Sequence, residues 1–317
     1  MMVTGSVRRI AINSRRPRAA LIFKFAHSTE FILMRIARIG LVGALLLGAS
    51  ACQTDDGGPV TRTLPPLAFV RYINAVPDTN NLTVRFIDQI DNVPQSFFNV
   101  PFRGLGQGGY QGVEAGDQRL RVFRHDPNLS TTTGGLGATT EQLADTTFTF
   151  VAGQYYTMLH LGYARAGQIP AQRVILINDA HPATNTSVSV RAIHAGLGIG
   201  AVDIFATPLP TTTLVGATPA FTNVAFQGVS AYATLPVGQF AAQIALTGTT
   251  ASAAAAAAPA GIAGTAAADP VAGATVAGSV LTAIAFPASV PGSPAAAAAA
   301  PSVIWFSDRQ PPRTTTP

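Results

Sequence analysis

The chain has 317 residues, a formal net charge of +5 and a hydrophobic content of 48%. Its single cysteine excludes a framework of disulfide bonds within the chain. Eight of the 20 Lys and Arg residues and one of the 15 acidic residues precede Cys52, which leaves 12 basic and 14 acidic residues from there onward. The formal charge of that part is about −2, so composition gives no reason to expect nucleic acid as a partner.

The N-terminal segment has the pattern of a bacterial signal peptide. Met34 is followed by two arginines, an apolar run over 39–48, small residues over 49–51, and Cys52. The run is about ten residues long, too short for the roughly 20 that cross a membrane. We therefore predict a leader at 1–51 in which Met34 is the true start. The alternative is an ordinary secretory signal followed by a chance cysteine.

The segment LLLGASAC, which ends at Cys52, resembles the lipobox of bacterial lipoproteins. The resemblance implies that Cys52 carries acyl chains such as palmitate and becomes the first residue of the mature protein. The lipid would bind the cell membrane or outer membrane, and the chain would face the periplasm or the cell surface. Gln53 in place of aspartate favours the outer membrane, by similarity to enterobacterial sorting. Residues 52–66, polar and containing Gly and Pro, are expected to be a flexible tether.

The rest of the chain repeats itself once. VRYINA at Val70 returns as VRAIHA at Val190, an offset of 120 residues. Further segments return in the same order at offsets of 122 to 129: NVPF as NVAF (Asn99, Asn223), Tyr110 with Gly116 as Tyr232 with Gly238, VAGQYYT as VAGSVLT (Val151, Val276) and VILIND as VIWFSD (Val174, Val303). Such a period is longer than a solenoid unit and predicts a duplicated module, with copies at 67–182 and 187–311.

Both copies are expected to be built from short β-strands. In the first copy we predict strands at 67–73, 82–87, 95–100, 118–123, 146–151, 154–161 and 173–177, separated by Gly, Pro and Asp turns. In the second copy we predict strands at 188–193, 201–205, 221–226, 239–246, 279–286 and 302–306. This spacing predicts an all-β chain of two tandem antiparallel Ig-like sandwiches. We expect them end to end, joined by the short stretch HPATNT.

The second copy also has an alanine-rich stretch at 251–274. Six alanines, 253–258, favour helix by propensity, but the Pro and Gly residues that follow shorten any helix below the 12 to 15 residues that are stable in water. We therefore expect a low-complexity loop, and another at 295–300. The tail at 312–317 is expected to be disordered.

The repeated segments VRYINAVPDTNNLTVRF and VRAIHAGLGIGAVDIF, with NVPF or NVAF and the VAG strand, resemble the domain of unknown function 4397 family. Its hallmark resembles V-R-V-x-H-A-S-P-D-A-P-x-V-D-V-Y. The resemblance implies secreted or lipid-anchored bacterial β-sandwich proteins without an established activity. The first copy keeps Pro77 and Asp78 but has Asn74 for the histidine, whereas the second keeps His194 and Asp203 but not the Pro-Asp turn. We interpret the motif as structural, shaping the first strand-to-strand turn.

No catalytic, cofactor or metal site is predicted. GLGQGG at Gly104 fits GxGxxG but lacks a following helix, so we read it as a turn. Gly228 and Ser230 are followed by Ala231, which breaks the GxSxG elbow of serine hydrolases. Four histidines are well separated and are expected to be surface or capping residues: His125, His160, His181 and His194.

Charge recurs in both copies at only two pairs of positions: Arg71 with Arg191, and Asp179 with Asp308. We expect surface or inter-strand ion pairs there. The sequence therefore predicts a lipid-anchored envelope protein that is not an enzyme, takes no cofactor, and binds or scaffolds an envelope protein or glycan. One alternative is an envelope hydrolase assembled from distant strands, in which His194 and Asp203 would be tested first. Another is a purely structural spacer.

Overall fold

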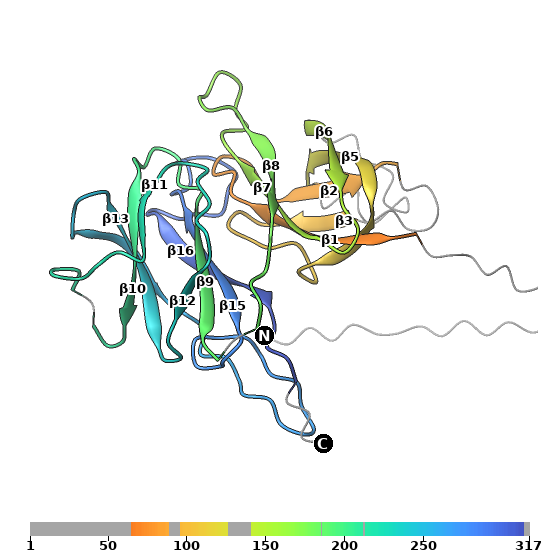
Figure 1. The fold of residues 1–317 in the computed structure, drawn as a ribbon. Coiled ribbons are helices and arrows are strands. Elements are labelled where there is room, and N and C mark those ends of the chain that lie inside the picture. Colours follow the sequence, from red (N-terminus) through yellow and green to blue (C-terminus); the bar gives the residue numbers. More distant parts are fainter. Residues whose placement is uncertain (1–64, 89–95, 126–140, 185, 212, 314–317) are drawn as a thin grey trace, which may run out of the picture. The chain divides into compact units, whose positions relative to one another are not determined.

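A computed structural model describes residues 65–88, 96–125, 141–184, 186–211 and 213–313. The predicted leader, Cys52 and nearly all of the tether lie outside the described residues, as do the last four residues. The described part falls in one compact unit and contains sixteen β-strands and no helix (Figure 1). Accordingly, no helix among these residues is long and apolar enough to cross a membrane.

The first half of the described chain is a sandwich of two four-stranded sheets. Its strands are β1 (Leu67–Asn74), β2 (Leu82–Phe86), β3 (Ser96–Val100), β4 (Gln111–Glu114), β5 (Gly116–Arg124), β6 (Gln142–Phe150), β7 (Tyr155–Leu161) and β8 (Arg173–Asn178). The strand orders are β4-β1-β7-β8 and β3-β2-β5-β6. All pairings are antiparallel except that of β1 with β7, which is parallel.

The second half repeats this topology with every strand number raised by eight. Its strands are β9 (Val188–His194), β10 (Val202–Pro208), β11 (Phe221–Val224), β12 (Ala233–Leu235), β13 (Phe240–Leu246), β14 (Ser252–Ala257), β15 (Val280–Phe286) and β16 (Ser302–Arg309). The strand orders are β12-β9-β15-β16 and β11-β10-β13-β14, again with one parallel pair, β9 with β15. The predicted all-β class with tandem sandwiches is confirmed.

The repeat also holds in the register of the strands. Arg71 lies opposite Thr157 across β1 and β7, and Arg191 lies opposite Thr282 across β9 and β15. Leu176 and Trp305, expected to be equivalent, lie opposite Met158 and Ala283, which are themselves equivalent. Strands β4 and β12 were not expected from the sequence, because three or four residues with Gly or Ala give no recognisable alternation.

The expectation of a loop at the alanine run is wrong for Ser252–Ala257, which forms the edge strand β14. The strand pairs antiparallel with β13, and the indole Nε1 of Trp305 donates a hydrogen bond to the carbonyl oxygen of Ala256 at 3.0 Å. Ala254 and Ala256 pack against the core of the second sandwich. Pairing and packing with the rest of the sandwich thus override the helical propensity of alanine.

Three large apolar clusters and a small fourth one, formed by Phe205, Leu214 and Ala245, hold the described chain together. Two of them fill the sandwiches, and the third joins the β1-β7-β8 face of the first half to the β9-β15-β16 face of the second. Its members are Ile73, Ala75, Leu159, Leu161, Ile177, Ile193, Ala195, Ile284, Phe286 and Phe306. Every residue of β9 and β15 is buried as a result. The halves therefore meet through the faces of two sheets, and not end to end as expected.

Candidate functional site

The recurring charged residues lie in the interface between the two halves. Val70 and Tyr72 point into the first core, so strand alternation turns Arg71 towards the other half. Arg191 has the same place on β9, Asp308 lies in β16, and Asp179 directly follows β8. Their exposed fractions are 0% for Arg71, 2% for Arg191, 1% for Asp179 and 4% for Asp308. Of the two expected kinds of ion pair, the surface one is therefore wrong, whereas Arg71 of β1 and Asp308 of β16 form an inter-strand pair.

Each arginine bridges the halves in the same way. Arg71 Nη2 donates to Asp308 Oδ1 of the second half at 2.7 Å, and Arg191 Nη2 donates to Asp179 Oδ1 of the first. Each Nε donates to a threonine of its own half at 2.8 Å: Thr157 for Arg71, and Thr282 for Arg191. The contacts have an approximate two-fold relation, like those of a symmetric dimer interface.

The carboxylates are saturated by donors from their own half. Asp179 Oδ2 accepts from the hydroxyls of Thr157 at 2.6 Å and Tyr110 at 2.7 Å. Asp308 Oδ2 accepts in the same manner from the second half: Thr282 at 2.5 Å and Tyr232 at 2.6 Å. The guanidinium groups also stack over tyrosine rings, Arg71 at 4.7 Å from the centroid of Tyr110 and Arg191 at 4.9 Å from that of Tyr232. We call these eight residues the charge network.

Burial and neighbouring charges shift the pKa values of several members of the charge network. Burial alone would raise the pKa of Asp308, but the nearby Arg71 and Arg191 outweigh it and hold the pKa below its usual value. Burial alone would lower the pKa of Arg71, but Asp308, Tyr110 and Asp179 together hold it above its usual value. Burial raises the pKa of Tyr110 and of Tyr232. The two arginines and the two aspartates thus satisfy one another within the charge network.

The polar residues of the family-like motif are used to shape turns. His194 Nδ1 accepts the backbone N–H of Gly196 at 3.1 Å, and the equivalent Asn74 Oδ1 accepts that of Val76 at 3.0 Å. Asp203 accepts the backbone N–H groups of Asn223 and Gly248 at 2.8 and 3.0 Å, and these bonds lower its pKa. The interpretation of the motif as structural agrees with these contacts.

The NVPF and NVAF segments share a backbone conformation at their asparagines. Asn99 and Asn223 have φ of 54° and 51°, a left-handed conformation that asparagine tolerates better than most residues. At each of them the register with the neighbouring strand shifts, and a side chain of that strand accepts the asparagine N–H: Thr83 in the first half and Asp203 in the second. The recurrence of these segments is thus explained by a β-bulge.

Comparison with known families gives a match over the first half of the described chain. The model of the domain of unknown function 4397 matches residues 68–205. The resemblance inferred from the sequence is confirmed over that stretch, which spans the first sandwich and runs through β9 into β10. No curated protein matches the chain.

Two solved structures show weak similarity. A leucine-rich repeat protein from Bacteroides thetaiotaomicron is 12% identical, with a TM-score of 0.19 over 74% of this chain, and this chain spans only 27% of its length. A candidate cell adhesion protein from Parabacteroides distasonis is 10% identical, with a TM-score of 0.20 over 76% of this chain and 99% of its own. Neither score is high enough to support an inference about the function of this chain.

His160 differs from the prediction for the histidines, because it is buried in the first sandwich and not at the surface or in a cap. The hydroxyl of Tyr72 donates to its Nδ1 at 2.7 Å, and its Nε2 lies 2.5 Å from Gln172 Oε1. Because that oxygen can only accept, the proton of a neutral ring is on Nε2. Burial lowers the pKa of His160 to about 4. In the second half, alanines take the places of Tyr72 and His160.

The glycine-rich segment forms the expected turn between β3 and β4. A Cβ on Gly104 would lie 2.6 Å from Pro101 Cγ, and one on Gly106 would overlap the ring of Phe97. Both glycines are therefore required by close packing of the turn against β3. Among the described residues no group of three or more His, Cys, Asp or Glu side chains could hold a metal ion.

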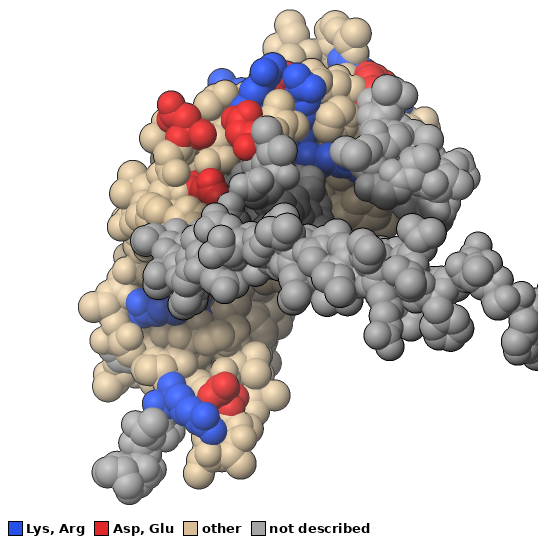
Figure 2. Space-filling view, turned by 90° about the vertical axis from the view of Figure 1, so that its right-hand side faces the viewer, with Lys and Arg blue, Asp and Glu red and all other residues tan. Residues whose placement is uncertain are grey.

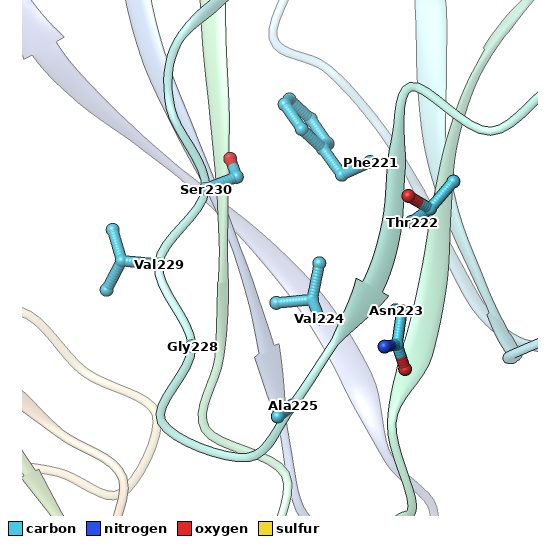
Figure 3. A pocket seen from close by; sticks show the side chains of 8 residues that line it. All are labelled: Phe221, Thr222, Asn223, Val224, Ala225, Gly228, Val229 and Ser230. Carbon is cyan, nitrogen blue, oxygen red and sulfur yellow. The ribbon is translucent and has the colours of Figure 1, made fainter.

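A shallow groove of about 300 Å³ lies beside β11 (Figure 3). Figure 3 shows Phe221 and Val224 on one side of β11, with Thr222 and Asn223 turned to the other side. The hydroxyl of Ser230 is occupied, since it accepts the N–H of Ala192 at 2.9 Å and donates to the carbonyl of Ala231 at 2.8 Å. The groove thus offers mainly apolar surface, and the hydroxyl of Ser230 is not free.

The outer face of the β2-β5-β6 sheet carries paired charges. Asp145 accepts from Arg119 at 2.7 Å and from Arg121 at 2.9 Å, and all three are partly exposed. Figure 2 shows basic and acidic residues next to one another, without a large area of one sign. On this face the charged side chains are thus paired with one another.

Proposed function

We propose that this protein is a lipid-anchored envelope protein that acts by binding or scaffolding, with its two sandwiches held as one rigid body. The observation that carries the proposal is the burial of the charge network. Charged groups that recur in both copies of a duplicated enzyme would be expected to converge in an open cleft. Here they pair with one another between the halves, where their effect is to fix the sandwiches together.

Ligand contacts are then expected on the loops and outer faces, which two rigid sandwiches hold at a constant separation. In both halves the motif residues hold turns and bulges. They therefore leave the loops and outer faces available for ligand contacts. The proposed location is the cell membrane or the outer membrane, through lipid on Cys52.

We predict that Cys52→Ala will move the protein from the membrane fraction to the soluble fraction. The physical reason is that stable anchoring needs at least two acyl chains, each contributing about 0.8 kcal/mol per buried methylene. Fractionation of cells that produce the full chain measures the effect, and Gln53→Ala is the matched control, which should stay in the membrane. Retention of the Cys52→Ala protein in washed membranes would contradict the anchor.

The proposed activity is tested with the purified Cys52→Ala protein, labelled and added to native envelopes, isolated peptidoglycan and envelope glycans. We expect saturable binding to one of these that unlabelled protein competes away, without release of product. A spacer would bind none of them. Turnover of peptidoglycan, glycoside, ester or peptide substrates that stays with the protein through purification would instead favour the hydrolase.

A further inference from the structure

The faces through which the halves meet carry equivalent polar residues, and we call each face a pairing surface. The first consists of the outward residues of β1, β7 and β8 with Tyr110 and Asp179, and the second of those of β9, β15 and β16 with Tyr232. We propose that the two pairing surfaces recognise each other without their covalent connection, so that the first half of one copy of the chain binds the second half of another. This inference does not depend on the proposed ligand binding.

The polar part of each pairing surface is largely assembled within its own half. Arg71 is held by Thr157 and Tyr110, and Asp179 by the same two residues. The cross-half polar contacts of this set are the two reciprocal arginine–aspartate pairs and one bond from Arg71 Nη1 to the carbonyl of Ser307 at 3.3 Å. Each half thus presents one preformed positive and one preformed negative group, and preformed groups cost less entropy on association.

The apolar part differs between the halves in size. Register places Leu161 at the position of Phe286, and Ile177 at that of Phe306. In the chain, the two phenylalanines of the second half share one cluster with the smaller residues of the first. At these two positions, two second halves would bring four phenylalanines into this space, and two first halves would bring none. Overfilling and cavities are both destabilising, so the mixed pair should be preferred.

The connection between β15 and β16 adds contacts that only the mixed pair has. Arg103 Nε donates to the carbonyl of Pro287 at 3.2 Å, and the backbone N–H of Val290 donates to the carbonyl of Pro77 at 2.9 Å. Gln227 is the residue of the second half that is equivalent to Arg103, and it has the same left-handed backbone conformation, with φ of 68° against 63°. A shorter amide cannot reproduce the bonds of the guanidinium group, which again favours one half of each kind.

The test uses the full chain with a protease site inserted between Ala183 and Thr184, which are exposed in the connection. After cleavage we expect the halves to co-elute at about 1 μM, which requires a Kd well below about 1 μM. After isotopically labelled and unlabelled cleaved protein are mixed, native mass spectrometry should find exchanged mixed pairs. Halves that separate at this concentration would overturn the proposal.

Two variants separate the polar from the apolar part. Asp308→Asn should weaken the association of the cleaved halves at least about 100-fold, because it leaves Arg71 buried without its partner. Asp145→Asn, in the exposed ion pair, is the matched control and should leave it unchanged. Phe286→Leu combined with Phe306→Ile should raise the share of pairs between two second halves. An unchanged share would show that side-chain size does not select the mixed pair. Fluorescence of Trp305 before cleavage shows that the second half of each variant is folded, and circular dichroism shows that the whole chain keeps its strands.

Discussion

Replacing Arg71 with methionine is expected to lower the free energy of unfolding by about 3 to 5 kcal/mol, the usual cost of removing one partner of a buried ion pair. Arg71 is fully buried, and its loss leaves Asp308 with the more distant Arg191 Nε, at 3.5 Å, as its remaining cationic partner. The Thr157 hydroxyl would also lose the guanidinium as a donor. Urea unfolding followed by the fluorescence of Trp305, which lies in the second half, measures the loss.

A double-mutant cycle separates the ion pair from the packing of the arginine stem. Combining Arg71→Met with Asp308→Asn removes both charges, so the double variant should be more stable than the sum of the two single losses predicts. The control is Arg119→Met in the exposed pair with Asp145, where a cost of about 0.2 to 1 kcal/mol is expected. A loss for Arg71→Met no larger than this control would contradict the assignment of the charge network as the lock between the halves.

Acidification from pH 6.5 to pH 4 is expected to remove about 3 kcal/mol of stability through His160 alone. The unfolded histidine takes up a proton near pH 6.5, whereas burial lowers the folded pKa to about 4. Over this window the unfolded state binds more protons, so stability is complete above pH 6.5 and falls as the pH approaches 4. The free energy of unfolding, measured at closely spaced pH values, should decrease by about 1.4 kcal/mol per pH unit from this group.

His160→Gln removes the titration but keeps a side chain that can donate and accept. We expect the free energy of unfolding of this variant to fall less steeply as the pH is lowered from 6.5 to 4. The slope should be smaller by nearly one proton, which is about 1.4 kcal/mol per pH unit. Tyr72→Phe is the control, because it removes the hydroxyl at Nδ1 but leaves the histidine buried, and it should keep the steep dependence. His194 and His181, whose pKa values burial also lowers, contribute equally to all these proteins and cancel in the comparison. Equal slopes for His160→Gln and the native protein would contradict this assignment.

Much of the strand pattern could be predicted from the sequence, because it depends on local signals. The runs around Val70, Leu82 and Val190 contain β-branched and aromatic residues bounded by turn residues, and each is a strand. The repeat also aligned Tyr110 with Tyr232, and Arg71 with Arg191, which have equivalent hydrogen bonds in the structure. These equivalences needed no three-dimensional information.

The candidate site was identified only as a pair of recurring charges, and its burial was missed. A signal was present: LAFVRYIN over Leu67–Asn74 is apolar at six of its eight positions, a pattern typical of strands covered on both faces. In such a strand an arginine must be buried and paired. The partner could not be predicted, because Asp308 is 237 residues from Arg71 and lies in the other half.

The sequence by itself determined the all-β class, the repeat and the places of the turns, since alternation and turn chemistry act over a few residues. Only the tertiary structure decided that Ser252–Ala257 is a strand, that His160 is buried, and that the halves meet through the faces of two sheets. Alanine, histidine and arginine have weak local preferences for a strand or for the interior. Their positions depend on the neighbours that the fold brings to them: β13 for the alanines, Tyr72 for His160, and the opposite half for the arginines.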